Sequence, residues 1–392
     1  MPETWSETGP ETWIVAATRS PIGRANKGSL VDLRPDDLAA AVVRAALAGL
    51  PSLDPDEVED VIVGCAQPAG EAGYNIARAV SLLSGLRDVP GTTVNRYCAS
   101  SLQAIRIAHH AILAGEGDLF VAAGVETVSR FSRGKSDGMP DTKNPLFGAG
   151  ELPNLYVAMG ETAENVAERE GITRAAMDEF SAMSQERAVA ARRDGLFARE
   201  ITPITTPGGQ RVLHDDGPRP GTTVEKLASL APAFRPDGRV TAGNACPLND
   251  GAAAVVLMSA ARARALGIAP RARIVSTAVS ALAPELMGLG PIEATRRALR
   301  LARKTMGDID LVEINEAFAA QVIPCASALE IPLEKLNVHG GAIALGHPFG
   351  MTGARLVTTL LHALEARDGR TGLATLCVGG GQGMAIILER PR

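Results

Sequence analysis

The feature that most constrains the fold is an internal repetition of pattern. Two segments about 250 residues apart present the same kinds of element in the same order, without sharing residue identity. Each begins with an apolar run, TWIVAATRSPIG or ARIVSTAVSALAP, and later reaches a polar turn before an amphipathic helix. Each ends on a strand that runs into glycine, LFVAAGVET or ATLCVGGGQ. Strands that alternate with helices indicate parallel strands covered by helices, so the repetition predicts two related α/β halves.

A long interval from about Ser129 to Val240 interrupts this rhythm. It is richer in proline, glycine and charge, and the apolar strand AAAVVLM follows it at residues 252–258. Insertions of this size usually form lids or binding loops. We therefore predict an N-terminal half at residues 1–128 and 241–270, an inserted loop domain at 129–240 and a C-terminal half at 271–392.

Composition and charge exclude several classes of protein. The chain is 46% hydrophobic and 21% charged, which indicates a folded core and not disorder. Its net charge of −5 provides no overall positive field for nucleic acid or an anionic membrane. Its apolar runs are shorter than the ~18 residues that span a bilayer. The start, MPETWSETGPETW, lacks a secretory pattern. We expect no nucleic-acid partner, no membrane span and a cytoplasmic location.

The cysteines are widely scattered and odd in number. No CxxC pair or Cys/His cluster accompanies them, which argues against a disulfide framework and predicts no metal site. They are therefore either core residues or part of the chemistry. The five are Cys65, Cys98, Cys246, Cys325 and Cys377.

Cys98 stands at the start of a predicted helix, where unpaired N–H groups and the helix dipole favour a thiolate. The dipole contributes about 0.3–1 kcal/mol, which is less than the ~1.4 kcal/mol of one pKa unit. A nearby base is therefore required. His347, in the pattern-equivalent turn GHPFG, is the best candidate. Taken singly, Cys98 is more often a small core residue, and His347 a structural residue of its turn.

Two more motifs carry groups suited to catalysis. Cys377 leads into three glycines, including Gly379, whose bare amides could donate to an oxyanion, although such triplets usually form tight turns. Asn315 and Glu316 follow the buried-looking strand DIDLVEI, where a strand-end cap is the plainer interpretation. Ligands collect at the carboxyl ends of parallel strands, so these turns are expected to converge. Together they predict a nucleophile, a base, a second proton carrier and an oxyanion hole.

From Trp13 to Glu389 the chain resembles the thiolase family, through motifs that are long and ordered. The resemblance implies an α/β thiolase fold: two duplicated βαβαβαββ halves with stacked five-stranded mixed sheets and an inserted loop domain. It also implies reversible cleavage of a 3-ketoacyl-CoA by CoA to acetyl-CoA and a shortened acyl-CoA. The motifs are VNRYCASSLQAI, MGETAENVA, TAGNACPLNDGAAAVV, VEINEAFA, NVHGGAIALGHPFGMTGAR and CVGGGQGMA.

The resemblance also assigns roles. Cys98 is implied to attack the ketone carbon and carry the acyl group as a thioester, with ping-pong kinetics. His347 is implied to take the thiol proton and to stabilise the acetyl thioester oxygen. Cys377 is implied to protonate the departing enolate and later to deprotonate CoA. Asn315 is implied to position a water in one oxyanion hole, and the amides of Cys98 and Gly379 form the other.

For CoA and substrate binding, the resemblance implies a second set of residues. Arg219 matches a basic residue near the nucleotide, although by itself it could be a solvated loop charge. Phe234 and Met287, taken alone, would ordinarily be core residues. No permanently bound cofactor is expected, since CoA and acetyl-CoA act as substrates. The other members of the set are Phe234, Cys246, Met287, Phe318 and Met159.

Some positions depart from the family pattern, and they leave substrate length and direction open. Cys246 replaces a common serine, and Ala158 precedes Met159 where biosynthetic members tend to have histidine. We expect a role in fatty acid or lipid β-oxidation. A biosynthetic acetoacetyl-CoA thiolase, a condensing enzyme of the ketosynthase kind, a redox sensor and a noncatalytic acyl-CoA or sterol carrier are the alternatives. A homodimer or homotetramer is expected, with possible association with a β-oxidation multifunctional subunit.

Overall fold

The computed structural model describes residues 10–131, 144–148 and 152–391. The start of the chain and two parts of the predicted loop domain, 132–143 and 149–151, lie outside these ranges. A ten-stranded mixed sheet has the order β10-β11-β12-β9-β1-β8-β5-β3-β4, with β2 paired to β8, and β6 and β7 form a separate hairpin. The strands are β1 (Thr12–Arg19), β2 (Gly23–Arg24), β3 (Asp60–Gly64), β4 (Gly91–Val94), β5 (Leu119–Thr127), β6 (Ile204–Thr205), β7 (Arg211–Val212), β8 (Asn249–Ser259), β9 (Ala272–Ala281), β10 (Leu311–Ile314), β11 (Thr371–Val378) and β12 (Gln382–Glu389).

The strand pairing repeats between the two ends of the chain. β3 pairs parallel with β5, and β5, β8 and β1 then follow in antiparallel order. β10, β11, β12 and β9 repeat this arrangement. The two half-sheets join through only two residue pairs, Trp13 with Arg273 and Ile14 with Ala272. At the edge where the first half has β4, the second half has a single parallel bridge between Val312 and Leu336.

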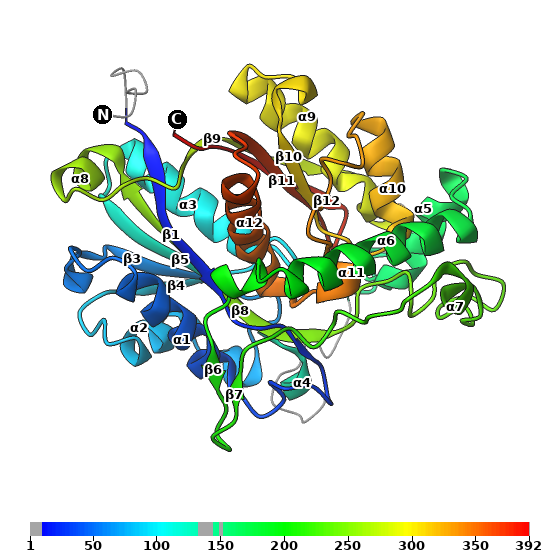
Figure 1. The fold of residues 1–392 in the computed structure, drawn as a ribbon, viewed down its shortest axis with the longest axis horizontal. Coiled ribbons are helices and arrows are strands. Elements are labelled where there is room, and N and C mark those ends of the chain that lie inside the picture. Colours follow the sequence, from blue (N-terminus) through cyan, green and yellow to red (C-terminus); the bar gives the residue numbers. More distant parts are fainter. Residues whose placement is uncertain (1–9, 132–143, 149–151, 392) are drawn as a thin grey trace.

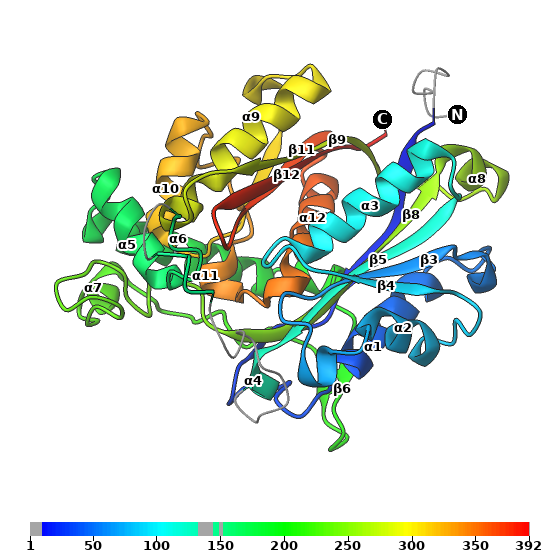
Figure 2. The ribbon, with the colours of Figure 1, turned by 180° about the vertical axis from the view of Figure 1, so that it is seen from behind.

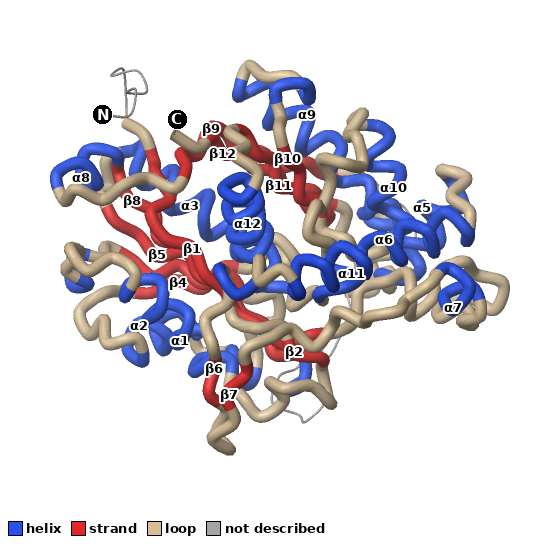
Figure 3. Tube along the Cα trace, in the orientation of Figure 1, coloured by secondary structure: helices blue, strands red, loops and turns tan. Residues whose placement is uncertain are grey.

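Helices cover the half-sheets in layers (Figures 1 and 2). α1 and α2 lie outside the first half-sheet, α9 and α10 outside the second, and α3 and α12 lie between the two. Figure 3 shows the helices and strands along the chain trace. The α-helices are α1 (Pro35–Ala48), α2 (Ile76–Leu83), α3 (Ser100–Ala114), α4 (Val128–Phe131), α5 (Met159–Arg169), α6 (Arg174–Arg193), α7 (Val224–Ala228), α8 (Ala260–Ala265), α9 (Gly290–Ala302), α10 (Ala319–Ala328), α11 (Ala342–Leu345) and α12 (Phe349–Ala366).

The core follows the apolar patterns of the sequence. Leu102, Ile105 and Ile112 recur on one face of α3 and pack against α12 and the inner faces of both half-sheets. β5 is buried along its whole length, as its apolar run LFVAAGV predicts for a strand covered on both faces. The central layer therefore fixes the amino-terminal ends of α3 and α12, one from each half of the chain.

The segment between β5 and β8 leaves the sheet and returns to it. α5, α6 and α7 lie beside the second half, and α6 runs along α11 (Figure 1). β8 then inserts between β1 and β5, which closes the first half-sheet. The domain boundaries drawn from the sequence stay a prediction. Within the described residues, every helix is too short or too polar to cross a bilayer.

Candidate active site

Cys98 lies in a tight turn between β4 and α3, two residues before the helix begins at Ser100. The Tyr97 backbone has a φ of 44°, a left-handed value that is uncommon for a residue other than glycine. Hydrogen bonds hold the turn: Asn95 Oδ1 accepts from the Tyr97 amide at 2.7 Å, and Ser100 Oγ accepts from the Arg96 amide at 2.9 Å. A strained turn held in this way is typical of functional sites.

Two backbone amides meet the sulfur of Cys98. One belongs to Gly379, in the glycine turn after β11, and the other to Cys98 itself. Both favour the thiolate, but burial outweighs them and raises the pKa of the thiol to about 12. The side chain is half-buried. The resting Cys98 side chain is therefore a protonated thiol that has two amide donors beside it.

His347 occupies the equivalent place in the second half, two residues before α12 begins at Phe349. Its amide donates to Asn249 Oδ1 at 3.0 Å. Gly346, with a φ of 112°, permits this approach, because a Cβ there would lie 2.5 Å from the Asn249 side chain. The loop before α12 is therefore fixed by the first residue of β8.

The hydrogen bonds of His347 define its tautomer. Thr352 Oγ1 donates to the Pro348 carbonyl at 2.8 Å, so its hydroxyl hydrogen is already used. His347 Nδ1, 2.7 Å from the same oxygen, must then donate to it. Nε2 is left as a proton acceptor. Burial lowers the His347 pKa to about 3, with help from the positive charge of Arg355, so the imidazole is neutral at physiological pH.

The turns that carry Cys98 and His347 meet because α3 and α12 touch at their first turns. The Ala354 amide donates to Ser101 Oγ at 2.9 Å, and a Cβ on Gly353 would lie 2.3 Å from the Leu102 nitrogen. Glu126, at the end of β5, accepts from the Gly350 amide at 2.8 Å and from the Ala66 amide at 2.9 Å. Burial raises the Glu126 pKa to about 7. This carboxyl group ties the start of α12 to the first half.

Asn315 and Glu316 lie at the end of β10 but have different surroundings. Asn315 Nδ2 is 3.5 Å from His347 Nε2, and its buried Oδ1 has no hydrogen-bond partner among the described residues. Glu316 accepts from Ser184 Oγ at 2.6 Å and from Asn337 Nδ2 at 2.8 Å. Asn315 thus faces the imidazole with an open acceptor, whereas Glu316 is satisfied by structural contacts.

Cys377 is the penultimate residue of β11 and is buried. Burial raises its pKa well above the usual value, and repulsion from the thiolate forms of Cys98, Cys325 and Cys246 raises it further. Burial is also the main cause that raises the Cys246 pKa, and the negative charge of a Cys98 thiolate is the second. The three sequence-predicted site cysteines, 98, 246 and 377, are therefore close enough to influence one another's ionisation.

A pocket of about 310 Å³ lies next to Cys246. Arg219, Phe234 and Cys246, all predicted from the sequence to contact CoA, contribute to its lining. Arg24 also lines the pocket. Burial lowers the Arg219 pKa most, and the positive charge of Arg24 lowers it further. The pocket therefore has a cationic part with two arginines and a part lined by Cys246.

Phe318, Met159 and Met287 are placed outside the lining of this pocket. Phe318 packs edge-on against Phe234, with ring centroids 6.1 Å apart, and a Cβ on Gly160 would meet the Phe234 ring at 2.1 Å. Met287 is buried and Met159 is half-buried, both in the core of the second half. Phe318 therefore supports the Phe234 side of the pocket, whereas the two methionines are placed as core residues.

Comparisons with known proteins agree with this geometry. Residues 12–261 match the family described as "Thiolase, N-terminal domain", and residues 268–390 match "Thiolase, C-terminal domain". The chain belongs to the thiolase family. As a thiolase it is an acyltransferase.

Three relatives illustrate the range of named activities within this thiolase group. The 3-ketoacyl-CoA thiolase of Aeromonas salmonicida (strain A449) is 45% identical over 96% of this chain and 98% of its own length. The 3-oxoadipyl-CoA/3-oxo-5,6-dehydrosuberyl-CoA thiolase of Escherichia coli (strain K12) is 46% identical over 97% and 99%. The crystal structure of the Bacillus anthracis acetyl-CoA acetyltransferase has 40% identity and a TM-score of 0.88, and covers 98% of this chain and 100% of that one.

Some residues of this thiolase site escaped the sequence argument. Thr352 carries a weak signal, a hydroxyl five residues after His347 within the first turn of a predicted helix. Arg24 carries none. Asn249 lies within the motif TAGNACPLNDGAAAVV, but its contact with His347 forms only through folding. No group of three or more histidine, cysteine or acidic side chains that could hold a metal ion occurs in the described part of the chain.

Proposed function

We propose that the protein cleaves 3-ketoacyl-CoA with CoA, giving acetyl-CoA and an acyl-CoA two carbons shorter, through an acyl thioester on Cys98. The observation that carries this proposal is the Cys98 sulfur beside the Gly379 amide, a hydrogen-bond donor brought from the other half of the chain. A nucleophile next to amide donors can attack a carbonyl while its oxyanion is stabilised.

In the first half-reaction, His347 Nε2 accepts the Cys98 proton as the sulfur bonds to the ketone carbon. The amides of Cys98 and Gly379 stabilise the oxyanion of the tetrahedral intermediate. The bond between carbons 2 and 3 then breaks, and its electron pair forms the enolate of acetyl-CoA. Cys377 donates its proton to carbon 2. Acetyl-CoA leaves, and the acyl group stays on Cys98.

In the second half-reaction, the Cys377 thiolate takes the thiol proton of an incoming CoA. The CoA sulfur attacks the acyl carbon, Cys98 leaves as thiolate, and the His347 imidazolium returns its proton. All three groups regain their resting protonation states. The second oxyanion hole is formed by His347 and a water positioned by Asn315, whose unpartnered Oδ1 supports this role.

CoA is proposed to bind in the pocket beside Cys246, with Arg219 and Arg24 at its phosphate groups. Phe234 lines the pantetheine part of this pocket, and Phe318 supports the ring from behind. Met159 and Met287 complete the apolar support. A cytoplasmic location, assembly into dimers or tetramers, and association with a multifunctional β-oxidation subunit stay predictions.

The names of the relatives leave β-oxidation, 3-oxoadipyl-CoA cleavage and acetoacetyl-CoA chemistry as candidate settings, and we propose β-oxidation. The deciding experiment is thiolytic kinetics with 3-ketoacyl-CoA substrates of increasing length, with 3-oxoadipyl-CoA included. Activity on long neutral chains supports β-oxidation. A preference confined to acetoacetyl-CoA indicates biosynthesis, and no turnover of any substrate contradicts the enzyme proposal and favours a carrier.

A further inference from the structure

The glycine turn that presents Gly379 to Cys98 has little rigidity of its own. It connects β11 to β12 through Gly379, Gly380 and Gly381, and the last two have φ values of 75° and 79°, which favour glycine. Glycine backbones are the least restricted in the chain. The Leu282 amide donates to the Gly381 carbonyl at 2.8 Å and holds the far end of the turn, so the orientation of the Gly379 amide depends on the contacts of Gly379 itself.

Gln382, the first residue of β12, forms one such contact. Its Nε2 donates to the Gly379 carbonyl at 3.2 Å, so that Gly379 is held on its carbonyl side while its amide faces the Cys98 sulfur. The Gln382 side chain is in turn held from the first half. Arg96 Nη1 donates to Gln382 Oε1 at 2.8 Å.

Arg96 connects this contact to the turn of the nucleophile. Its backbone bridges to Cys98, and its amide donates to Ser100 Oγ at 2.9 Å. Its Nε donates to Gln103 Oε1 at 2.9 Å, which anchors the guanidinium on the first turns of α3. Among the described residues, Arg96 forms no ion pair with a carboxylate. Its charged donors instead serve two glutamine oxygens, in the fixed fork geometry that arginine provides.

We propose that Arg96 and Gln382 are positioning residues that act in series to hold the Gly379 amide against the Cys98 sulfur. The inference rests on the proposed role of these two groups in acyl transfer. The bridge spans the junction between the two halves, since Arg96 precedes α3 and Gln382 begins β12. It fixes the position of the Gly379 amide relative to the Cys98 sulfur. Displacements of about 1 Å between such groups can lower the rate a hundredfold.

The test measures steady-state cleavage of acetoacetyl-CoA and the rate of acyl-enzyme formation in rapidly quenched samples. The variants are Gln382→Met, Arg96→Met and the double variant. Each single variant is expected to lose between about tenfold and a hundredfold in kcat and in acylation rate. The KM for CoA stays unchanged, because CoA binds elsewhere. Since the contacts are in series, the double variant is no slower than the slower single variant.

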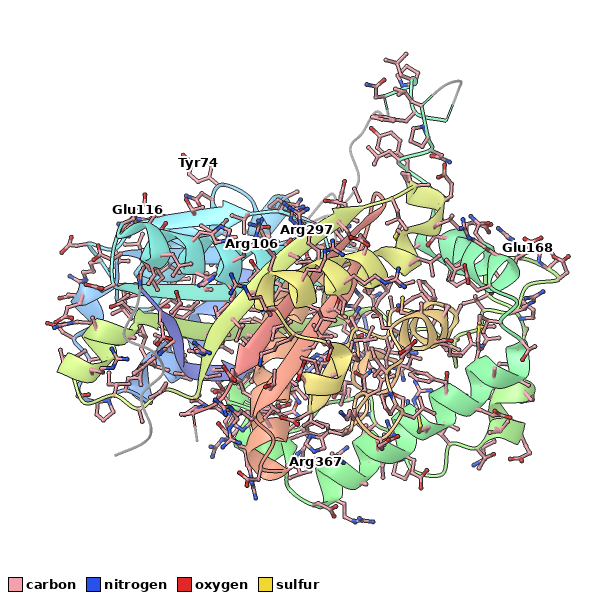
Figure 4. The ribbon with its side chains drawn as sticks, turned by 90° about the horizontal axis from the view of Figure 1, so that it is seen from above. Tyr74, Arg106, Glu116, Glu168, Arg297 and Arg367 are labelled. Atoms are coloured by element: carbon pink, nitrogen blue, oxygen red, sulfur yellow. The ribbon has the colours of Figure 1, made fainter. Side chains whose placement is uncertain are left out.

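Two further variants separate positioning from general damage. Arg96→Lys, which keeps one charged donor, is expected to recover part of the rate lost in Arg96→Met. Arg106→Met is the matched control: Arg106 lies on α3 beside Arg297 of α9, and its charge interacts with Arg96, but within the described residues it has no hydrogen bond to Gln382 (Figure 4). Its kcat is expected to equal that of the parent.

A second readout does not depend on turnover. Loss of the Gly379 donor makes the Cys98 thiolate less stable, so alkylation of Cys98 by iodoacetamide at a fixed pH is expected to slow in both single variants. The inference would be overturned if the single variants kept the parent rates, or if Arg106→Met lost as much activity as they do. It would also be overturned if the double variant lost the product of the two single losses. If Arg96→Met does not fold, Gln382→Met decides alone. Absence of acyl enzyme in the parent contradicts the proposed function instead.

Discussion

The Gly379 amide lies beside the sulfur of Cys98 and favours its thiolate, although 281 positions separate the two residues in the numbering. The contact crosses the boundary between the two halves of the chain. Gly379 follows β11 in the second half, and Cys98 precedes α3 in the first. Neither half therefore contains both parts of the proposed acyl-transfer site, and the central layer of α3 and α12 brings the two parts together.

The hydroxyl of Thr352 is expected to control which His347 nitrogen accepts the proton. Thr352→Val keeps the shape but removes the acceptor of the Nδ1 hydrogen, which leaves a buried donor unsatisfied at a cost of about 1–3 kcal/mol. We expect a lower free energy of unfolding and a fall of about tenfold in kcat. Thr352→Ser, which retains the hydroxyl, serves as the control. Equal kcat in both variants would refute this role for Thr352.

Cys377 and Cys325 offer a matched pair of buried thiols in the second half. Cys377→Ala should lower kcat by about 10²–10⁴, because the enolate loses its proton donor and incoming CoA loses its base. Cys325, whose sulfur donates to the Gly288 carbonyl at 3.3 Å, has no proposed role in the reaction. Cys325→Ala should keep a kcat near that of the parent. Comparable losses in the two variants would indicate packing damage and not proton transfer.

The resting protonation states predict how the reactivity of Cys98 depends on pH. With the thiol pKa near 12 and that of His347 near 3, thiol and imidazole are both neutral between these values. The rate of Cys98 alkylation by iodoacetamide, followed by peptide mass spectrometry, should then rise about tenfold per pH unit from about pH 6 to 9. A plateau at neutral pH would reveal a preformed thiolate–imidazolium pair.

Arg219 is expected to act in binding and not in chemistry. Arg219→Gln removes one of the two arginines of the pocket, so the KM for CoA should rise about tenfold while kcat changes little. Arg211→Gln changes an exposed arginine of β7 and should leave both constants as in the parent. A loss confined to kcat in Arg219→Gln would place that residue nearer the reacting atoms.

The parts of the fold and site that the sequence predicts are those with local signals. Repeated apolar runs indicate the two α/β halves, and the turns around Cys98, His347 and Cys377 stand out by residue type. The contacts that position these turns have no local pattern. Asn249 and Gln382 are ordinary polar residues. Their partners, His347 for Asn249 and Arg96 for Gln382, lie 98 and 286 positions away in the sequence. Only tertiary structure brings such partners together.

The thiol environment was also only partly predictable. A helix start suggests a modestly stabilised thiolate, yet the helix begins two residues after Cys98, and burial makes the thiol harder to ionise. Burial depends on packing from both halves of the chain, which the sequence of one turn does not contain. The need for a base, inferred from the small size of the dipole contribution, becomes stronger in the structure.

Acylation of Cys98 is the most direct test of this account. The protein is mixed with acetoacetyl-CoA in the absence of free CoA, quenched in acid, digested and analysed by mass spectrometry. We predict one acetyl group on the peptide that contains Cys98, its disappearance after CoA is added, and no such adduct in Cys98→Ala. An unmodified Cys98 peptide, or an acetyl group on Cys246 or Cys377 in its place, would contradict the central claim.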